Sequence, residues 1–177
     1  HTVTDGFAGS RAPLQVGAEL YGHAGIESDF EILELMLNML ALSGIRDVHI
    51  DLGHVGIFRS LAAQAGLDSQ DEQSLFDALQ RKAIPEINEI LARLDLHSDI
   101  SYCLSALADL NGGVEVLERA EQIFQHADRA VLSALHDIKQ ISALLQQRMP
   151  DLPVHYDLAE LRGYAYKTGM VFAAFIP

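Results

Sequence analysis

The chain has 177 residues, a length typical of one domain, and 49% of them are apolar, which is enough to form a substantial core. It carries 25 acidic residues against 12 basic ones, so its formal net charge is −13 at pH 7. A surface this negative repels the phosphates of nucleic acids and anionic lipid headgroups, which speaks against non-specific binding to either.

The single cysteine, Cys103, excludes an internal disulfide framework and fits the reducing environment of the cytoplasm. It shares a helical apolar pattern with Leu104 and Leu107, so we expect it to pack in the core rather than to act as a nucleophile. No apolar run approaches the roughly 20 residues that span a bilayer, and no signal-peptide pattern is present. Because the chain begins at His1 and ends at Pro177 directly after an apolar run, we expect both ends to be cut from a longer protein.

Apolar and polar residues alternate over 13–21, which predicts a half-buried strand. Gln15 and Glu19 lie on the polar face of this expected strand, so their side chains should point in the same direction. A helix should follow, with Ser28 opening a capping box at its start and Gly44 as its C-terminal cap.

A second alternating run, 47–52, predicts a strand that leads into a long helical block. Helical periodicity continues from about 55 to 149, interrupted at glycines and prolines. The expected helices are 55–65, 69–81, 84–95, 98–110, 113–125 and 128–148. Strand patterns return at 154–158 and 164–176. The order of these elements predicts a single α+β domain over 1–177 with a helical insertion.

Several kinds of active site find no support in the sequence. It contains no glycine-rich phosphate loop, no His-Glu-x-x-His motif and no nucleophile elbow. His49, Asp51 and His54 are candidate metal ligands, but two of them share a strand face and His54 lies beyond a turn, so we favour surface or second-layer polar roles. His23 is interpreted as a loop residue. We therefore expect no metal and no cofactor.

Arg162 stands in a strand-forming stretch of a very acidic chain, and its guanidinium suits a carboxylate through two parallel hydrogen bonds. A pocket in which Gln15, Glu19 and Arg162 converge would suit a free amino acid, with the carboxylate at Arg162. The alternative is that Arg162 pairs with Glu160 or Glu19 and binds no ligand. From spacing alone, the internal ion pair is the favoured interpretation.

Two segments resemble signatures of the class II aminoacyl-tRNA synthetases that are specific for histidine. The run QVGAELYG is similar to the family's Q-x-G-x-E-x-x-G, and ELRGYAYKTGMVFAAF is similar to its R-G-L-D-Y-Y-T-G-x-V-F-E. The resemblance covers 9–60 and 152–176, and the intervening block matches only as an insertion at the same place. It implies a class II aminoacyl-tRNA synthetase-like core, that is, an antiparallel sheet flanked by helices, with the helical insertion at roughly 55–149.

The resemblance also implies a histidine-binding site. Gln15 and Glu19 match positions that contact bound histidine in the synthetases, and Arg162 matches a position at its carboxylate. The aromatic residues of the second signature help to close the imidazole pocket, and here they correspond to Tyr164 or Tyr166.

Departures from the synthetase pattern imply that histidine is not activated. The stretch 1–5 lacks the Arg-x-Glu pair that contacts ATP in the synthetases, and Ala165, Lys167 and Ala173 replace Asp, Tyr and Glu of the signature. Without the cation that meets the triphosphate, adenylate formation should fail.

The phrases GAELYGHAGIESD, DLGHVGIF and ELRGYAYKTGMVFAAF resemble one paralogous group in particular, the regulatory subunits of ATP phosphoribosyltransferase in histidine biosynthesis. This resemblance implies a non-catalytic cytoplasmic protein that dimerises through the synthetase-like core and does not bind tRNA. It also implies assembly with the short-form catalytic subunit into a hetero-octamer, activation of that subunit, and feedback inhibition with histidine as effector. Two alternatives remain open: a fragment of an active histidyl-tRNA synthetase, and an unrelated helical scaffold without a polar cluster on its sheet.

Overall fold

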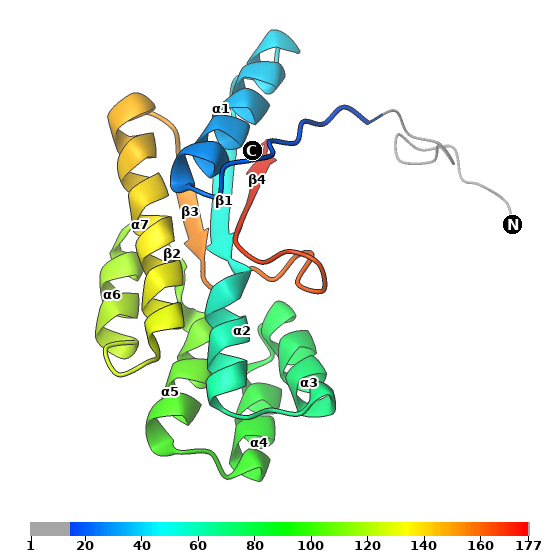
Figure 1. Ribbon diagram of the computed structural model, residues 1–177, viewed down its shortest axis with the longest axis vertical. Coiled ribbons are helices and arrows are strands. Elements are labelled where there is room, and N and C mark those ends of the chain that lie inside the picture. Colours follow the sequence, from blue (N-terminus) through cyan, green and yellow to red (C-terminus); the bar gives the residue numbers. More distant parts are fainter. Residues whose placement is uncertain (1–14, 177) are drawn as a thin grey trace, which may run out of the picture.

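The computed structural model describes residues 15–176. They fold into a four-stranded sheet with a block of helices at one end of it (Figure 1). The helices are α1 (Ile26–Leu42), α2 (Val55–Gln64), α3 (Ser69–Gln80), α4 (Ile84–Leu94), α5 (Ser98–Ala106), the 3-10 turn η1 (Leu107–Asp109), α6 (Glu115–Ile123) and α7 (Arg129–Arg148). The strands are β1 (His49–His54), β2 (Asn111–Gly112), β3 (Val154–Asp157) and β4 (Met170–Phe175).

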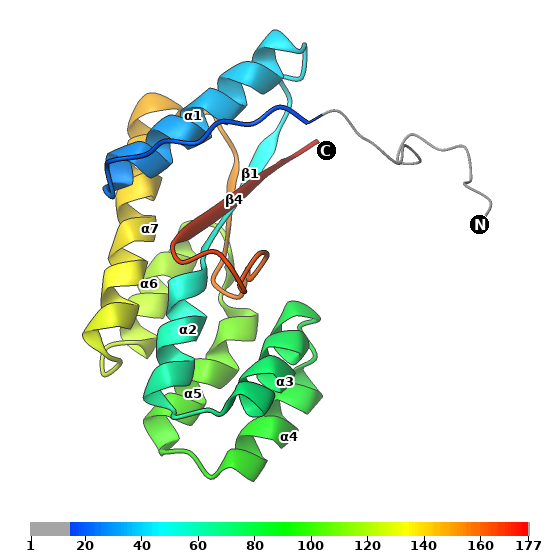
Figure 2. The same ribbon diagram turned by 45° about the vertical axis from the view of Figure 1, so that its right-hand side comes forward.

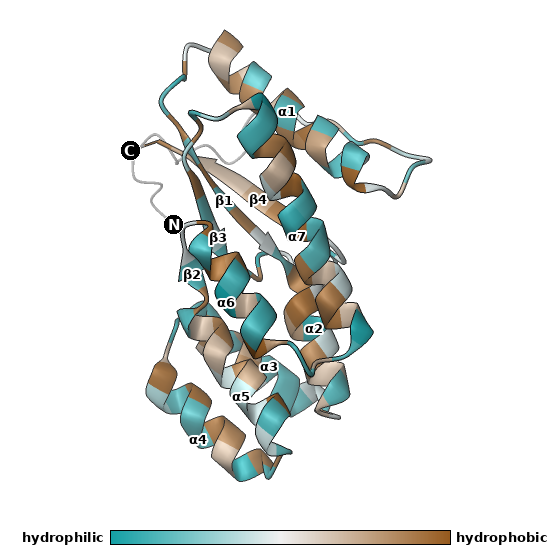
Figure 3. Cartoon of the chain, turned by 90° about the vertical axis from the view of Figure 1, so that its left-hand side faces the viewer, coloured by the Kyte–Doolittle hydropathy of each residue, from teal (hydrophilic) through white to brown (hydrophobic). Residues whose placement is uncertain are grey.

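The expected helices of the block are confirmed, and the residues that start and bury them explain why. Asp68 caps α3 by accepting hydrogen bonds from the backbone N–H groups of Gln70 at 2.9 Å and Asp71 at 2.8 Å. Pro85 occupies the first turn of α4, where its missing N–H costs nothing. In α7 the apolar residues spaced by three and four are buried: Val131, Leu135, Ile138, Ile141 and Leu145. Hydrophobic and hydrophilic residues accordingly alternate along α6 and α7 (Figure 3).

The sheet has the order β2-β3-β1-β4, and it is mixed. β1 runs parallel to β3 and antiparallel to β4, while β2 is antiparallel to β3. The α+β class is confirmed, but the sheet is not antiparallel throughout. The long helical block between β1 and β3 brings the chain back to the end of the sheet at which β1 begins. β3 therefore runs in the same direction as β1. The short connection 158–169 then reverses the chain before β4.

The first and last predicted strands need correction. Positions 13 and 14 lie outside the described residues, and residues 15–21 belong to no strand. Their side chains are exposed, and Val16 retains 73% of its accessible surface, because no strand among residues 15–176 pairs with this segment. The strand expected from 164 begins only at Met170, because residues 161–167 form turns.

The ends of α1 show one wrong and one confirmed prediction. The helix begins at Ile26 with Gly25 at its N-cap, so Ser28 lies inside it, and its hydroxyl instead meets the ring nitrogen Nδ1 of His23 at 2.8 Å. Gly44 does terminate the helix, with φ of +85°. The N–H groups of Gly44 and Ile45 donate to carbonyls of the last turn at 3.0 and 2.9 Å, which is the Schellman arrangement.

The two faces of the sheet differ in burial. The helices α1 and α7 lie against the sheet, with α7 contacting β1 and α1 contacting β4 (Figure 2). Ile50 and Leu52 of β1 are fully buried. The alternate residues His49 and Asp51 are only partly buried on the other face, as the two-residue period of a strand requires. The expected core position of Cys103 is confirmed, since it retains 3% of its accessible surface. Within 15–176, no helix combines the length and the apolar character needed to cross a membrane.

Candidate functional site

Polar side chains gather on the less covered face of the sheet. The register pairs Asp51 of β1 with His155 of β3 and places His49 opposite Phe175 of β4. The rings of His49 and Phe175 stack with their centroids 5.5 Å apart. A scaffold of unrelated origin was expected to lack such a polar cluster, so this face speaks against that alternative.

A tight turn follows β3, at the edge of the sheet where the parallel strands β1 and β3 end. The N–H of Glu160 donates to the carbonyl of Asp157 at 3.1 Å, and the N–H of Ala159 donates to the Asp157 side chain at 3.0 Å. Gly53 of β1 permits this turn to pack closely. A Cβ atom at Gly53 would lie 2.6 Å from the Asp157 carbonyl oxygen and 2.7 Å from Cβ of Glu160. The lack of a side chain at position 53 therefore lets the turn that carries Asp157 and Glu160 pack directly against β1.

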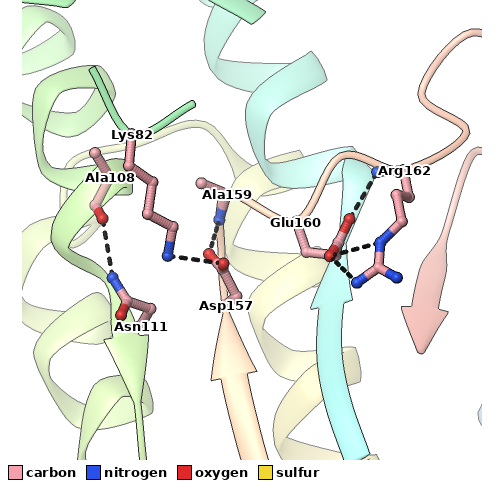
Figure 4. Close-up of polar contacts among 7 residues, drawn as sticks. All are labelled: Lys82, Ala108, Asn111, Asp157, Ala159, Glu160 and Arg162. Atoms are coloured by element: carbon pink, nitrogen blue, oxygen red, sulfur yellow. Dashed lines mark hydrogen bonds and ion pairs between the residues drawn. The ribbon is translucent and has the colours of Figure 1, made fainter. Parts of the chain in front are cut away.

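Two ion pairs flank this turn (Figure 4). Lys82, at the end of α3, places its Nζ 2.9 Å from an Asp157 carboxylate oxygen. Arg162 donates to Glu160 from Nε at 3.0 Å, from Nη2 at 2.6 Å and from its backbone N–H at 2.8 Å. Burial alone would raise the pKa of Glu160, but the hydrogen bonds and charge of Arg162, together with Lys167, bring it below its ordinary value. The two pairs line one cavity of 350 Å³.

Tyr164 turns away from Arg162 and toward the helical block. Its hydroxyl donates to the Glu72 carboxylate of α3, and its ring packs on Phe58 and Phe76 with centroid distances of 5.3 Å. The guanidinium of Arg59 lies 4.7 Å from the centre of the same ring. Burial, reinforced by the hydrogen bond and charge of Glu72, raises the pKa of Tyr164. Tyr164 thus anchors the connection before β4.

The other expected histidine contacts lie elsewhere. Tyr166 retains 80% of its accessible surface, and Gln15 and Glu19 are exposed on the segment before α1. The Glu19 carboxylate accepts a hydrogen bond from the hydroxyl of Tyr21. Across 15–176, no hydrogen bond or ion pair joins Gln15 or Glu19 to Arg162. The structure does not bring the five residues together, and their assignment to histidine stays a prediction.

Lys82 and Asp157 were missed from the sequence. Asp157 lies near the end of the strand predicted over 154–158, but the carboxyl end of a strand marks a common ligand site only where strands run in parallel, and the parallel pairing of β1 and β3 was not predicted. Lys82 carried no signal, since its place beside Asp157 depends on how α3 packs. Its backbone has φ of +49°, an unusual conformation for a residue with a side chain.

The histidines considered as metal ligands have separate structural partners. His54 caps α2 by accepting a hydrogen bond from the Gly56 N–H at 3.0 Å, while its Nε2 faces Asp137 at 3.7 Å. Burial lowers the pKa of His54, although the charge of Asp137 acts in the opposite direction. His49 stacks on the edge strand. In the described part of the chain, no three His, Cys, Asp or Glu residues are grouped to hold a metal ion.

Comparisons with known proteins agree with this architecture. A family model described as histidyl-tRNA synthetase matches residues 1–177. The chain is 50% identical over its full length to the ATP phosphoribosyltransferase regulatory subunit of Nitrosococcus oceani, of which it covers 44%. An ATP phosphoribosyltransferase regulatory subunit/histidyl-tRNA synthetase from Bacillus halodurans superposes with a TM-score of 0.74 at 25% identity, over 87% of this chain and 40% of that one.

The fold also recurs in the ATP phosphoribosyl transferase (HisG:HisZ) complex from Thermotoga maritima, with a TM-score of 0.61 at 18% identity. That match covers 86% of this chain and 52% of the other. The chain spans less than half the length of the regulatory subunit from Nitrosococcus oceani. Since the family model matches from the first residue to the last, this chain belongs to the histidyl-tRNA synthetase family.

Proposed function

We propose that the full-length protein is a non-catalytic regulatory subunit of ATP phosphoribosyltransferase in histidine biosynthesis. The observation that carries this proposal is the 50% identity, over all 177 residues, to a protein of that name. The substitutions in the second signature support it, because Ala165 and Lys167 replace side chains of the synthetase pattern.

In this proposal the protein forms a homodimer through its synthetase-like core and joins short-form catalytic subunits in a cytoplasmic hetero-octamer. Histidine binds one conformational state of the complex more tightly and so shifts the catalytic chains toward their inhibited state. The net charge of −13 makes tRNA an unfavourable ligand for this part of the protein.

A histidyl-tRNA synthetase remains the second candidate, because the family model carries that description. ATP–pyrophosphate exchange with histidine separates the two functions. We expect the full-length protein to show no exchange above a protein-free blank, since the sequence lacks the Arg-x-Glu pair that meets ATP. Histidine-dependent exchange would establish adenylate formation and refute the proposal.

Assembly is tested separately by light scattering. Mixing the full-length protein with the short catalytic subunit should give a particle heavier than either component alone. The proposed complex would be contradicted if the measured masses stay at those of the separate components. The mixture is measured at concentrations up to about 100 μM, which is about 100 times a Kd of 1 μM.

A further inference from the structure

We propose that a groove along the outer face of α1 is a docking site for a basic amphipathic helix of the catalytic subunit. This α1 groove is lined by the outward residues of the helix, by the segment before it and by β4: residues 16–18, Ile32, Leu35, Met36, Met39, Leu40, Ser43 and Phe172. It shares no lining residue with the cavity beside Arg162. The inference rests on the proposed function for the identity of the partner chain.

Helix α1 has two apolar faces, and the described residues bury one of them. Phe30 and Leu33 are buried on the face that packs toward α7. On the other face, apolar residues recur at spacings of three and four from Ile32 to Leu40, and Leu35 retains 39% of its accessible surface. A helix that is apolar on nearly all sides is normally covered on all sides, and an exposed apolar patch marks an interaction surface.

The α1 groove has the shape and the composition that a partner helix requires. The segment 15–21 runs back along α1 and contributes the second wall (Figure 2). The groove has a volume of 370 Å³, and Ser43 alone among the described residues that line it has a polar side chain. Met36 and Met39 have flexible side chains, which adapt to the residues that are inserted between them. An amphipathic helix binds such a groove by inserting apolar side chains spaced by three and four residues.

The charges beside the groove specify the polar face of the partner helix. From 15 to 45 the sequence has no lysine or arginine and five acidic residues: Glu19, Glu27, Asp29, Glu31 and Glu34. Glu27, Glu31 and Glu34 follow at spacings of four and three, so they form an acidic stripe on α1 beside the groove. Glu34 already meets Arg148, whereas Glu27 and Glu31 are exposed. Lysine or arginine beside the apolar face of the partner would pair with this stripe and be steered toward it.

Two other occupants fit the α1 groove less well. A second copy of this chain would place the acidic stripe against its own copy in a symmetric contact, and like charges repel. An anionic membrane surface is repelled by the same charges, because helices that lie on membranes carry lysine and arginine on their polar face.

Calorimetric titration of the full-length protein with the short-form catalytic subunit tests the apolar wall of the groove. Leu35→Asp places a charge among the apolar side chains, so we expect the Kd to rise by about tenfold or more. Leu132→Asp is the matched control, because Leu132 of α7 also retains 39% of its accessible surface and lies outside the groove. It should leave the Kd unchanged.

Charge reversal tests the acidic stripe. Glu31→Lys should weaken binding of the catalytic subunit by about fivefold, mainly through slower association. Glu118→Lys makes the same change in net charge at an exposed position of α6 and should have no such effect. A fluorescent peptide of leucine and lysine at helical spacing should bind the wild type and compete with the catalytic subunit. The same peptide with glutamate in place of every lysine should not bind, and equal binding of the two peptides would contradict the charge requirement.

The outcomes separate the α1 groove from the proposed function. A wild-type protein that does not bind the catalytic subunit refutes the proposed function and this inference together. Equal binding by the wild type, Leu35→Asp and Glu31→Lys overturns the groove and leaves the regulatory complex in place. The inference is also overturned if Leu35→Asp alone dissociates a homodimer, or lowers the Tm more than Leu132→Asp does. A second copy, or the rest of the same polypeptide, would then be what covers the groove.

Discussion

Tyr164 joins the connection before β4 to the helical block. Its hydroxyl donates to Glu72, and its ring packs against Phe58 of α2 and Phe76 of α3. The closing of an imidazole pocket, which the resemblance implies for Tyr164 or Tyr166, stays a prediction. Gly163, with φ of +76°, lies between Arg162 and Tyr164 and turns the chain there. The regular alternation that a strand would impose is lost at this point, so spacing alone could not give the direction of either side chain.

Tyr164→Phe isolates the hydroxyl, because the phenyl ring can keep its contacts with Phe58 and Phe76. We expect the free energy of unfolding to fall by about 0.5–1.5 kcal/mol, the usual net value of one hydrogen bond. Urea denaturation measures it. Tyr102→Phe is the control, since Tyr102 retains 59% of its accessible surface and its hydroxyl bonds to no described residue. Equal losses in the two variants would show that the Glu72 contact contributes nothing.

His54 links stability to pH. Burial holds its folded-state pKa below the ordinary value of 6.5, so the unfolded chain binds the proton more readily. The stability that neutral His54 provides is therefore complete above that value and is lost as the pH falls toward the folded-state pKa. Protonation of Nδ1 would also remove the acceptor that caps α2 at Gly56.

His54→Asn should keep a side-chain cap and remove the titration. Between about pH 7 and pH 5, the free energy of unfolding should decline less in the variant than in the wild type. Asp29 also has a raised pKa, because it is partly buried and lies near the charge of Asp137. Both carboxylates are present in the wild type and in the variant, so the difference between their stability–pH curves reports His54. Parallel curves would contradict this account.

At the scale of elements, the sequence predicted the helices well, but it did not predict the extents of the first and last strands, 13–21 and 164–176. Helix ends depended on local features such as Asp68, Pro85 and Gly44, which act on neighbouring backbone groups. A strand depends on a partner, and residues 15–21 have none within the described chain although their pattern alternates. The parallel pairing of β1 and β3 was also hidden, because it follows from the path of the whole helical block.

The contact between β1 and the turn after β3 gives a prediction at this scale. Gly53→Ala would force a Cβ atom against the Asp157 carbonyl and Glu160, so we expect a loss of about 1–3 kcal/mol in the free energy of unfolding. Gly169→Ala is the control, because nothing lies within 4 Å of its added Cβ, and it should change stability by less than about 0.5 kcal/mol. Thermal or urea unfolding of both variants compares them. A Gly53→Ala protein as stable as the control would show that this approach is not tight.

At the scale of the molecule, the family followed from two motifs in order, while the geometry of the site did not. Gln15 and Glu19 are far from Arg162 in sequence, and no described contact joins them to it. The acidic composition was informative in another way, since a net charge of −13 gives a long-range field that does not depend on any single contact. Composition therefore gives an expectation about partners, namely weak binding of nucleic acid, and says nothing about the geometry of the pocket.

The rate of ATP phosphoribosyl transfer, measured with purified short-form catalytic subunit and increasing amounts of the full-length protein, tests regulation most directly. The account predicts that the rate rises, saturates at a fixed ratio of the two chains, and is zero with the full-length protein alone. A rate that does not change at any ratio, under conditions where the catalytic subunit responds to a known regulatory chain, would contradict it.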